Sequence, residues 1–433
     1  MQATVEITSS LGRRMSVAIP MLLIEEEISQ RLNKLARTAK LAGFRPGKVP
    51  MKLVQQQFGY SVRQEVISST VERTFGDAVE QNKLKIAGRP TIEPKPAEGA
   101  DHFEYIATFE VFPEVAVGDF SGIAIERPIL QITDAEVDKT LSVLRKQRRS
   151  FEPVKRAAKM GDQVNVVLRA EMDGKEVEGT DGQSVDLVLG EGGRIADFDN
   201  NIVGAKAGQT QKFEIAYAPD FANPELAGKT LGYEVTINSI AEARLPEVNA
   251  DFARELGVED GDVARMRAEI KENLEQEVAK RVRTLLKDQV YKLLLERVNV
   301  DLPHALVSLE INRLMQTAQN NMQSRGVDMS NITLEPVHFE EQAQRHVKLR
   351  LILAEIVSRN ELHANPEQVR SFVEEFAKSF EHPAEVVRWY YADPQRMEEP
   401  VGLATEENVV NWLLGLAKVT DKEVAFDELM GST

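Results

Sequence analysis

Apolar and polar residues alternate at the start of the chain. The segments "TVEITS" and "RMSVAIP" alternate with period two on either side of "SLGR", which is the pattern of a β-hairpin. The later segment "HFEYIATFEVFP" alternates in the same way and predicts returning strands. Between them the period becomes helical, with an apolar stripe at about 100° per residue. The stripe consists of Ile28, Leu32, Leu35, Ala39 and Ala42. A second helix is expected from about Ser61 to Gln81.

Period two returns in the middle of the chain. The segment "TDAEVDKTLSVLRKQRRSFEP" predicts a helix with Thr133 as its N-cap. After it, "GDQVNVVLRAEMDGKEVEG" predicts a hairpin that turns at Asp173-Gly174. Three more strands are expected in "VDLVLG", "QKFEIAYAP" and "LGYEVTINSI", and one short helix in "RIADFDNNIVGA". Residues 150–246 therefore predict a compact α+β domain.

Helical periodicity continues from "RLPEVN" to the end of the chain. Apolar residues mark one long helix around residues 274–286 and another around residues 306–315. The segments "FEEQAQRHVKLRLILAEIVSRNEL" and "NPEQVRSFVEEFAKSF" predict two more, the second with Asn365 as N-cap and Pro366 as its first residue. The whole chain therefore predicts a multidomain α+β fold.

The composition limits the chemistry that the protein can perform and the cellular compartment in which it is expected. The 433 residues include no cysteine, which excludes disulfides, thiolate catalysis and zinc-thiolate sites and suits a reducing cytosol. No apolar run approaches the ~20 residues of a membrane helix. Arg13-Arg14 precedes an apolar run, as in a twin-arginine export signal. Three glutamates at 25–27 close that run without a cleavage site, so a cytoplasmic protein is expected.

Charge is distributed unevenly. The formal net charge is −16, yet residues 31–63 contain eight basic residues and no acidic one. These are Arg31, Lys34, Arg37, Lys40, Arg45, Lys48, Lys52 and Arg63. A basic region on an acidic protein predicts one anionic partner for one face. The alternative is an ordinary solvated helix face.

The stretch "LAGFRPGKVP" lies within this basic region. It is not a Walker A loop, because Gly43 and Gly47 are one residue too close and Val49 replaces the hydroxyl residue. A plain helix–helix connection, with Gly43 as C-cap and Pro50 opening the next helix, is the alternative. That alternative leaves Phe44 unexplained, because a bulky apolar ring at a loop tip is costly unless it contacts something.

Other catalytic and metal-binding patterns are missing from the sequence. The six histidines have no H-x-x-x-H spacing, "GEGGR" does not fit a Rossmann glycine motif, and no G-x-S-x-G occurs. We therefore expect neither a metal nor a cofactor.

The segment "GFRPGKVP" resembles the ribosome-docking signature of the trigger factor family, bacterial chaperones that meet nascent chains at the tunnel exit. The resemblance extends over essentially the whole chain. It implies docking through Gly43, Phe44, Arg45, Pro46, Gly47, Lys48, Val49 and Pro50. Phe44 and Arg45 would contact an exit-tunnel protein and adjacent rRNA of the large subunit. Pro46 stands where some members have a basic residue.

The resemblance also implies a domain order. Residues 1–112 would form an α+β ribosome-binding domain, residues 150–246 an inserted FKBP-like α+β prolyl isomerase domain, and residues 247–433 an all-helical chaperone domain. Residues 113–149 would be a helical arm of that split C-terminal domain. Implied partners are the ribosome, nascent and unfolded polypeptides, and a second copy when the chain is off the ribosome, but no membrane. The family's association with cell division and the cell cycle is implied as well.

The middle segments "GDQVNVVL", "DGKEVEG", "VDLVLG", "RIADF" and "AYAPDF" follow the order of the FKBP family. Such pockets hold an X-Pro bond in an apolar cleft that favours the twisted amide. By position, the pocket would consist of Ile195, Phe198, Phe221 and Tyr233, with Leu168 and Val177 where aromatics are usual. Ala196-Asp197 replaces the usual Pro-Gly pair. Modest isomerase activity is expected, and the alternative is that these residues only pack a core.

Three functions were weighed. The first is a ribosome-associated chaperone for unfolded chains with an attached prolyl isomerase. The second is a free prolyl isomerase whose helical parts only recruit substrate. The third is a periplasmic chaperone, which would need an export signal. The basic region and Phe44 favour the first, because a free isomerase needs neither.

Overall fold

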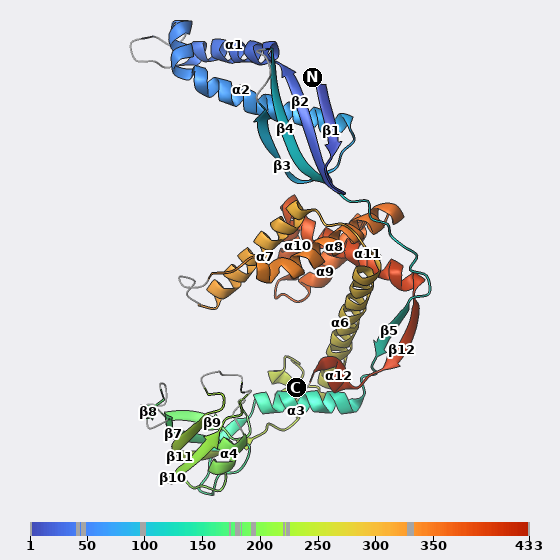
Figure 1. Ribbon diagram of the computed structural model, residues 1–433. Helices are drawn as coiled ribbons and strands as arrows, with labels where there is room; N and C mark the ends of the chain where they lie inside the picture. The colour runs from blue at the N-terminus through green and yellow to red at the C-terminus, as the bar shows by residue number, and fades with distance from the viewer. Residues whose placement is uncertain are drawn as a thin grey trace. The chain divides into compact units, whose positions relative to one another are not determined.

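The structure is a computed structural model. It describes residues 2–39, 44, 49–95, 101–172, 175–177, 182, 184–191, 196–219, 221, 226–326 and 333–431. Two compact units are present. The first comprises Met1–Arg127 and Arg283–Lys422, and the second comprises Pro128–Val282 and Glu423–Thr433. Figure 1 shows their helices and strands.

A four-stranded antiparallel sheet begins the first unit (Figure 1). Its strands are β1 (Gln2–Ile7), β2 (Gly12–Pro20), β3 (Ile86–Lys95) and β4 (His102–Val111), in the order β1-β2-β4-β3. The predicted hairpin and the returning strand β4 are confirmed. Strand β3 was not predicted, because Pro90 and Pro94 interrupt its pattern. Its position at the sheet edge tolerates them, since an edge strand can do without some ladder donors.

Two helices pack on this sheet, α1 (Met21–Thr38) and α2 (Met51–Gln81). The Phe75 ring of α2 meets Phe109 of β4 edge to face, with centroids 5.4 Å apart. Helix α2 begins well before the predicted Ser61. The polar stretch "QQQ" hides the helical period there, and only Val54 marks the buried stripe before Phe58.

The second unit contains a six-stranded sheet (Figure 1). Its strands are β6 (Ser150–Pro153), β7 (Gln163–Met172), β8 (Lys175–Glu176), β9 (Ser184–Val188), β10 (Thr210–Ala216) and β11 (Thr230–Arg244). The main path is β10-β11-β7-β8, while β6 pairs with β11 and β9 with β7. The short helix α4 (Ala196–Ile202) lies where the sequence predicts it. Asp173 and Gly174 lie outside the described residues.

Helix caps follow the sequence closely. Helix α3 (Asp134–Gln147) starts at Thr133, whose hydroxyl and Glu136 form a capping box. Helix α9 (Pro366–Ala377) starts at Asn365, whose side chain accepts the Gln368 N–H at 2.8 Å. Both predicted N-caps are confirmed.

The remaining elements are mostly helical, and the predicted long helices are confirmed. They are α5 (Ala250–Glu255), α6 (Val263–Arg297), α7 (His304–Ser324), α8 (Val337–Asn360), α10 (Pro383–Tyr391), the 3-10 helix η2 (Pro394–Met397), α11 (Glu398–Leu416) and α12 (Phe426–Met430). In addition, β5 (Ala124–Ile129) pairs with β12 (Lys418–Glu423) in a two-stranded sheet that the sequence did not predict.

A buried carboxylate joins α7 to α8. Glu310 is 3% exposed and accepts two hydrogen bonds from Arg313, at 2.6 and 2.9 Å. Nδ1 of His346 on α8 lies 2.9 Å from its Oε1, and Arg350 lies 3.5 Å from its Oε2. The bonds from Arg313 lower the pKa of Glu310 to about 2 despite its burial, and the contact with His346 adds to the lowering.

Candidate functional site

The end of α1 and the start of α2 flank the predicted docking segment. Helix α1 stops at Thr38, and the Ala39 N–H caps it by donating to the Leu35 carbonyl at 2.7 Å. At the other end, the Pro50 carbonyl accepts the N–H groups of Leu53 and Val54, at 3.0 and 3.2 Å. The described helix α1 has Ala39 as its C-cap, and Gly43, which was predicted for that role, lies outside the described residues. Pro50 does lead into the next helix, as predicted.

Two residues inside the predicted docking segment have opposite environments. The Phe44 side chain is 40% exposed. Val49 is only 7% exposed and belongs to the core formed by the sheet and the two helices. Val49 therefore anchors the loop to the domain. Five further residues of the predicted segment lie outside the described residues: Gly43, Arg45, Pro46, Gly47 and Lys48.

The basic region divides into paired and unpaired cations. Arg31 contacts the carboxylates of Glu27 and Glu65. Lys34, Arg37, Lys52 and Arg63 are exposed, and no described carboxylate lies within ion-pair distance of them. The expected basic surface is therefore real on both helices, with one of its members neutralised.

Aromatic rings gather between α4 and the sheet of the second unit. Phe198 of α4 is 5% exposed and lies edge to face with Phe213 and Tyr233, with centroids 5.5 and 5.4 Å apart. Phe213 and Tyr233 are cross-strand partners on β10 and β11 and stack at 5.7 Å. Phe221 meets Tyr217 edge to face at 4.8 Å. We call these five rings the aromatic cluster.

A hydroxyl pair connects the two halves of the cluster. Oη of Tyr217 lies 2.5 Å from Oη of Tyr233. Burial raises the pKa of the Tyr233 phenol, and the bond to Tyr217 raises it further. The Tyr233 hydroxyl therefore stays protonated well into the alkaline range and can act as a donor.

The other predicted pocket residues lie on the adjoining strand. Leu168 of β7 is paired with Val235 and packs on the core beside Tyr233. The Val177 N–H donates to the carbonyl of Ala170, the residue paired with Tyr233. The sheet thus brings Phe198, Phe221, Tyr233, Leu168 and Val177 into one region. Ile195 lies outside the described residues.

Two members of the cluster, Phe213 and Tyr217, were not predicted from the sequence. Both belong to "QKFEIAYAP", in which Phe213, Ile215 and Tyr217 alternate with polar or small residues. That alternation places all three on one face of β10 and its extension, so the signal was present in the sequence.

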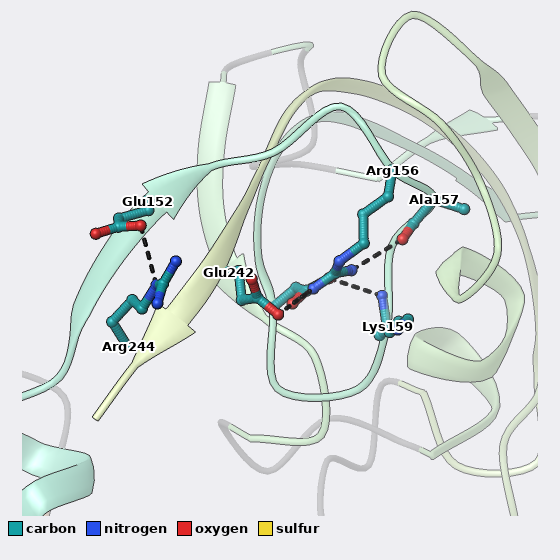
Figure 2. Close-up of polar contacts among 7 residues, drawn as sticks. Glu152, Arg156, Ala157, Lys159, Glu242 and Arg244 are labelled. Carbon is teal, nitrogen blue, oxygen red and sulfur yellow. Dashed lines mark hydrogen bonds and ion pairs between the residues drawn. The ribbon is translucent and has the colours of Figure 1, made fainter.

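Ion pairs fasten the strands at the base of this sheet. Arg156 donates to both carboxylate oxygens of Asp162, at 2.5 and 2.9 Å, and to Glu242 at 3.1 Å (Figure 2). Arg244 pairs with Glu152 across the β6–β11 ladder at 2.9 Å. The strands by which the chain enters and leaves the sheet are therefore held together.

Among the described residues, no three or more His, Cys, Asp or Glu side chains are grouped so that they could hold a metal ion. Nor is any helix in the described part of the chain both long and apolar enough to span a bilayer.

Comparison with protein families assigns the three regions of the chain. Residues 1–144 match the model "Bacterial trigger factor protein (TF)", and residues 262–415 match the model of the "Bacterial trigger factor protein (TF) C-terminus". Residues 154–238 match "FKBP-type peptidyl-prolyl cis-trans isomerase". The chain belongs to the trigger factor family.

Individual trigger factors agree with this assignment. The chain is 55% identical over 434 residues to the trigger factor of Methylobacillus flagellatus, with 100% of each chain covered. It is 49% identical over 433 residues to that of Nitrosospira multiformis, again with 100% of each chain covered. A solved structure described as "Promiscuous Substrate Recognition in Folding and Assembly Activities of the Trigger Factor Chaperone" matches with a TM-score of 0.51 and 16% identity. That match covers 96% of this chain and 100% of the other, and shows the fold.

Membership in the trigger factor family decides among the three functions. The chain is a ribosome-associated chaperone that acts on unfolded chains and carries a peptidyl-prolyl isomerase domain. A free prolyl isomerase is not favoured, because the trigger factor matches extend over the N-terminal and C-terminal regions as well.

Proposed function

We propose that this trigger factor docks beside the tunnel exit of the large ribosomal subunit through residues 43–50. Phe44 and Arg45 would contact an exit-tunnel protein and adjacent rRNA. The observation that carries this proposal is the 40% exposed Phe44 ring in the segment between the end of α1 and the start of α2. Pro46 and Pro50 restrict the backbone torsions of this segment, so less conformational entropy would be lost on binding. Arginine suits rRNA because its planar guanidinium matches phosphate geometry.

Cosedimentation with 70S ribosomes tests the docking surface. Phe44→Ala combined with Arg45→Ala should abolish cosedimentation without unfolding the chain, because Phe44 is exposed. Phe112→Ala is a matched control, since Phe112 is 43% exposed and lies outside the loop. Ribosome affinity that stays unchanged in the folded double variant would rule out this docking surface.

We propose further that the aromatic cluster binds the proline ring of an X-Pro segment. Phe198, Phe221 and Tyr233 would form aromatic walls, and Leu168 and Val177 a less aromatic side. Ile195 would complete the pocket. An aliphatic side positions the twisted amide less tightly than aromatic rings would, so catalysis would be modest.

The division of labour along the chain is also a proposal. Residues 1–112 would bind the ribosome, and residues 150–246 would carry the isomerase. Unfolded clients would be held by residues 247–433 together with the arm at 113–149. The protein would work in the cytoplasm and form a homodimer off the ribosome. The link to cell division stays a prediction.

A further inference from the structure

Tyr60 on α2 is more exposed than any other large apolar side chain in the described part of the chain, at 80%. The opposite side of the same helix segment is buried, with Val54, Val62 and Val66 between 0 and 2% exposed. Tyr60 therefore points away from the domain core. An aromatic ring with so much surface in water loses the burial that normally favours it.

The helix face around Tyr60 is mostly cationic and polar, and its exposed apolar member is Leu53, two turns before the ring and 36% exposed. Lys52, Gln56, Tyr60 and Arg63 are all exposed. Their spacings of four, four and three residues place them in one row on the helix surface. The row extends about 16 Å along the axis at 1.5 Å per residue. Residues 51–64 contain no acidic residue. Below, these four residues are called the Tyr60 row.

Immediate neighbours of the ring distinguish between kinds of partner. The positions three and four residues from Tyr60 are Gln56, Gln57, Arg63 and Gln64, all exposed. A protein partner would be expected to meet an apolar patch with a polar rim. A single ring surrounded by amides and a guanidinium instead matches the surfaces that stack unpaired bases and hold phosphates.

We infer that the Tyr60 row binds ribosomal RNA next to the docking loop. The Tyr60 ring would stack on an unpaired base, and Lys52 and Arg63 would contact phosphates on either side of it. Gln56 would hydrogen-bond to the base or the sugar. This inference rests on the proposed docking, because the ribosome supplies the RNA. It adds a base-stacking contact from α2 to the contacts proposed for the loop.

Binding of the full chain to 70S ribosomes separates stacking from charge. Tyr60→Ala should weaken binding about tenfold, and Tyr60→Phe should remain within about twofold of wild type. Arg63→Gln should reduce the slope of log affinity against log salt by roughly 0.7–0.9, whereas Tyr60→Ala should leave the slope unchanged. Tyr391→Ala, at a residue 51% exposed on α10, is the control for loss of an exposed ring. All three positions are exposed, and circular dichroism checks that each of the four variants is folded.

A photoreactive phenylalanine analogue in place of Tyr60 identifies the partner directly. Crosslinks to rRNA support the inference. Crosslinks only to a ribosomal protein or to a second copy of the chain overturn it, as does wild-type affinity in Tyr60→Ala. If wild-type protein fails to cosediment with ribosomes, the docking proposal itself fails. The two failures are therefore distinguishable.

Discussion

Oη of Tyr217 and Oη of Tyr233 lie 2.5 Å apart. Through this contact the aromatic cluster becomes continuous from Phe198 on α4 to Phe221 beyond β10. One hydroxyl donates to the other, so the pair retains one proton that can be offered to a third group. The cluster is therefore apolar on its faces but keeps a donor at its centre.

Alkaline pH should weaken the part of the fold that contains this pair. The folded-state pKa of Tyr233 is raised above the ordinary value near 10. A raised pKa means that the folded state favours the protonated phenol, so this stabilisation is complete below about pH 10 and is lost as the pH rises further. Tyr233→Phe should cost about 1 kcal/mol at pH 7 and should flatten the decline above pH 10. Chemical denaturation between pH 7 and 11 measures both effects.

The exposed Tyr60 provides the control for that experiment. Tyr60→Phe makes the same chemical change at a ring outside the aromatic cluster that has 80% of its surface in water. If the free energy of unfolding falls equally above pH 10 in the wild type and in Tyr233→Phe, then Tyr233 is not the group responsible for the loss of stability.

Isomerase activity should be measurable and should depend on the cluster. The assay is protease-coupled cis/trans isomerisation of an X-Pro peptide. Tyr233→Ala should lower kcat/KM about tenfold, equivalent to the loss of ~1.4 kcal/mol of transition-state stabilisation. Phe198→Ala should lower it as well, but Phe198 is buried, so its truncation also costs about 3–5 kcal/mol of stability.

Tyr233→Phe separates the ring from the hydroxyl in the same assay. It keeps the apolar wall and should retain most of the activity if the wall favours the twisted amide. Wild-type rates in both alanine variants would mean that the pocket lies elsewhere. No rate above background in the wild type would leave the domain as a peptide-binding module.

Acid should loosen the α7–α8 pair through Glu310. Its folded-state pKa of about 2 lies below the reference value of 4.5. A depressed carboxylate pKa gives stability that is complete above pH 4.5 and is lost as the pH falls towards 2. Glu310→Gln should destabilise the chain by about 2 kcal/mol at pH 7, because charge-assisted hydrogen bonds are lost.

Thermal unfolding at pH 7 and pH 3 checks this prediction. The difference in unfolding temperature between Glu310→Gln and the wild type should be smaller at pH 3 than at pH 7. Glu341→Gln, at an exposed carboxylate on α8, is the matched control for the same chemical change outside the Glu310 contacts. A gap of constant size would mean that Glu310 does not titrate as described.

A variant lacking residues 150–246 should still suppress aggregation of a denatured client, because the client-holding surface is proposed to lie in the helical region. Ser150 and Arg244 are partners in the β6–β11 ladder. The two ends left by the deletion therefore lie close together and can be joined without a long linker. Light scattering of the client with and without the variant measures suppression. Complete loss in a folded variant would place the activity in the excised domain.

Local features were determined by the sequence alone. The first hairpin, the capping boxes at Thr133 and Asn365 and the alternating strands of the second unit depend on neighbouring residues. Such features can be derived because periodicity and capping chemistry act over a few positions. The exposed Phe44 loop tip was predicted on the same basis, since no local partner explains that ring.

Contacts between distant residues were decided only by the tertiary structure. Val49 belongs to the predicted docking segment, and only the packing of α1 and α2 on the sheet determines that its side chain is buried. The Tyr217–Tyr233 pair and the Glu310–His346 contact join different elements, 16 and 36 positions apart. No local pattern encodes such partners, because register and helix packing select them only after the chain has folded.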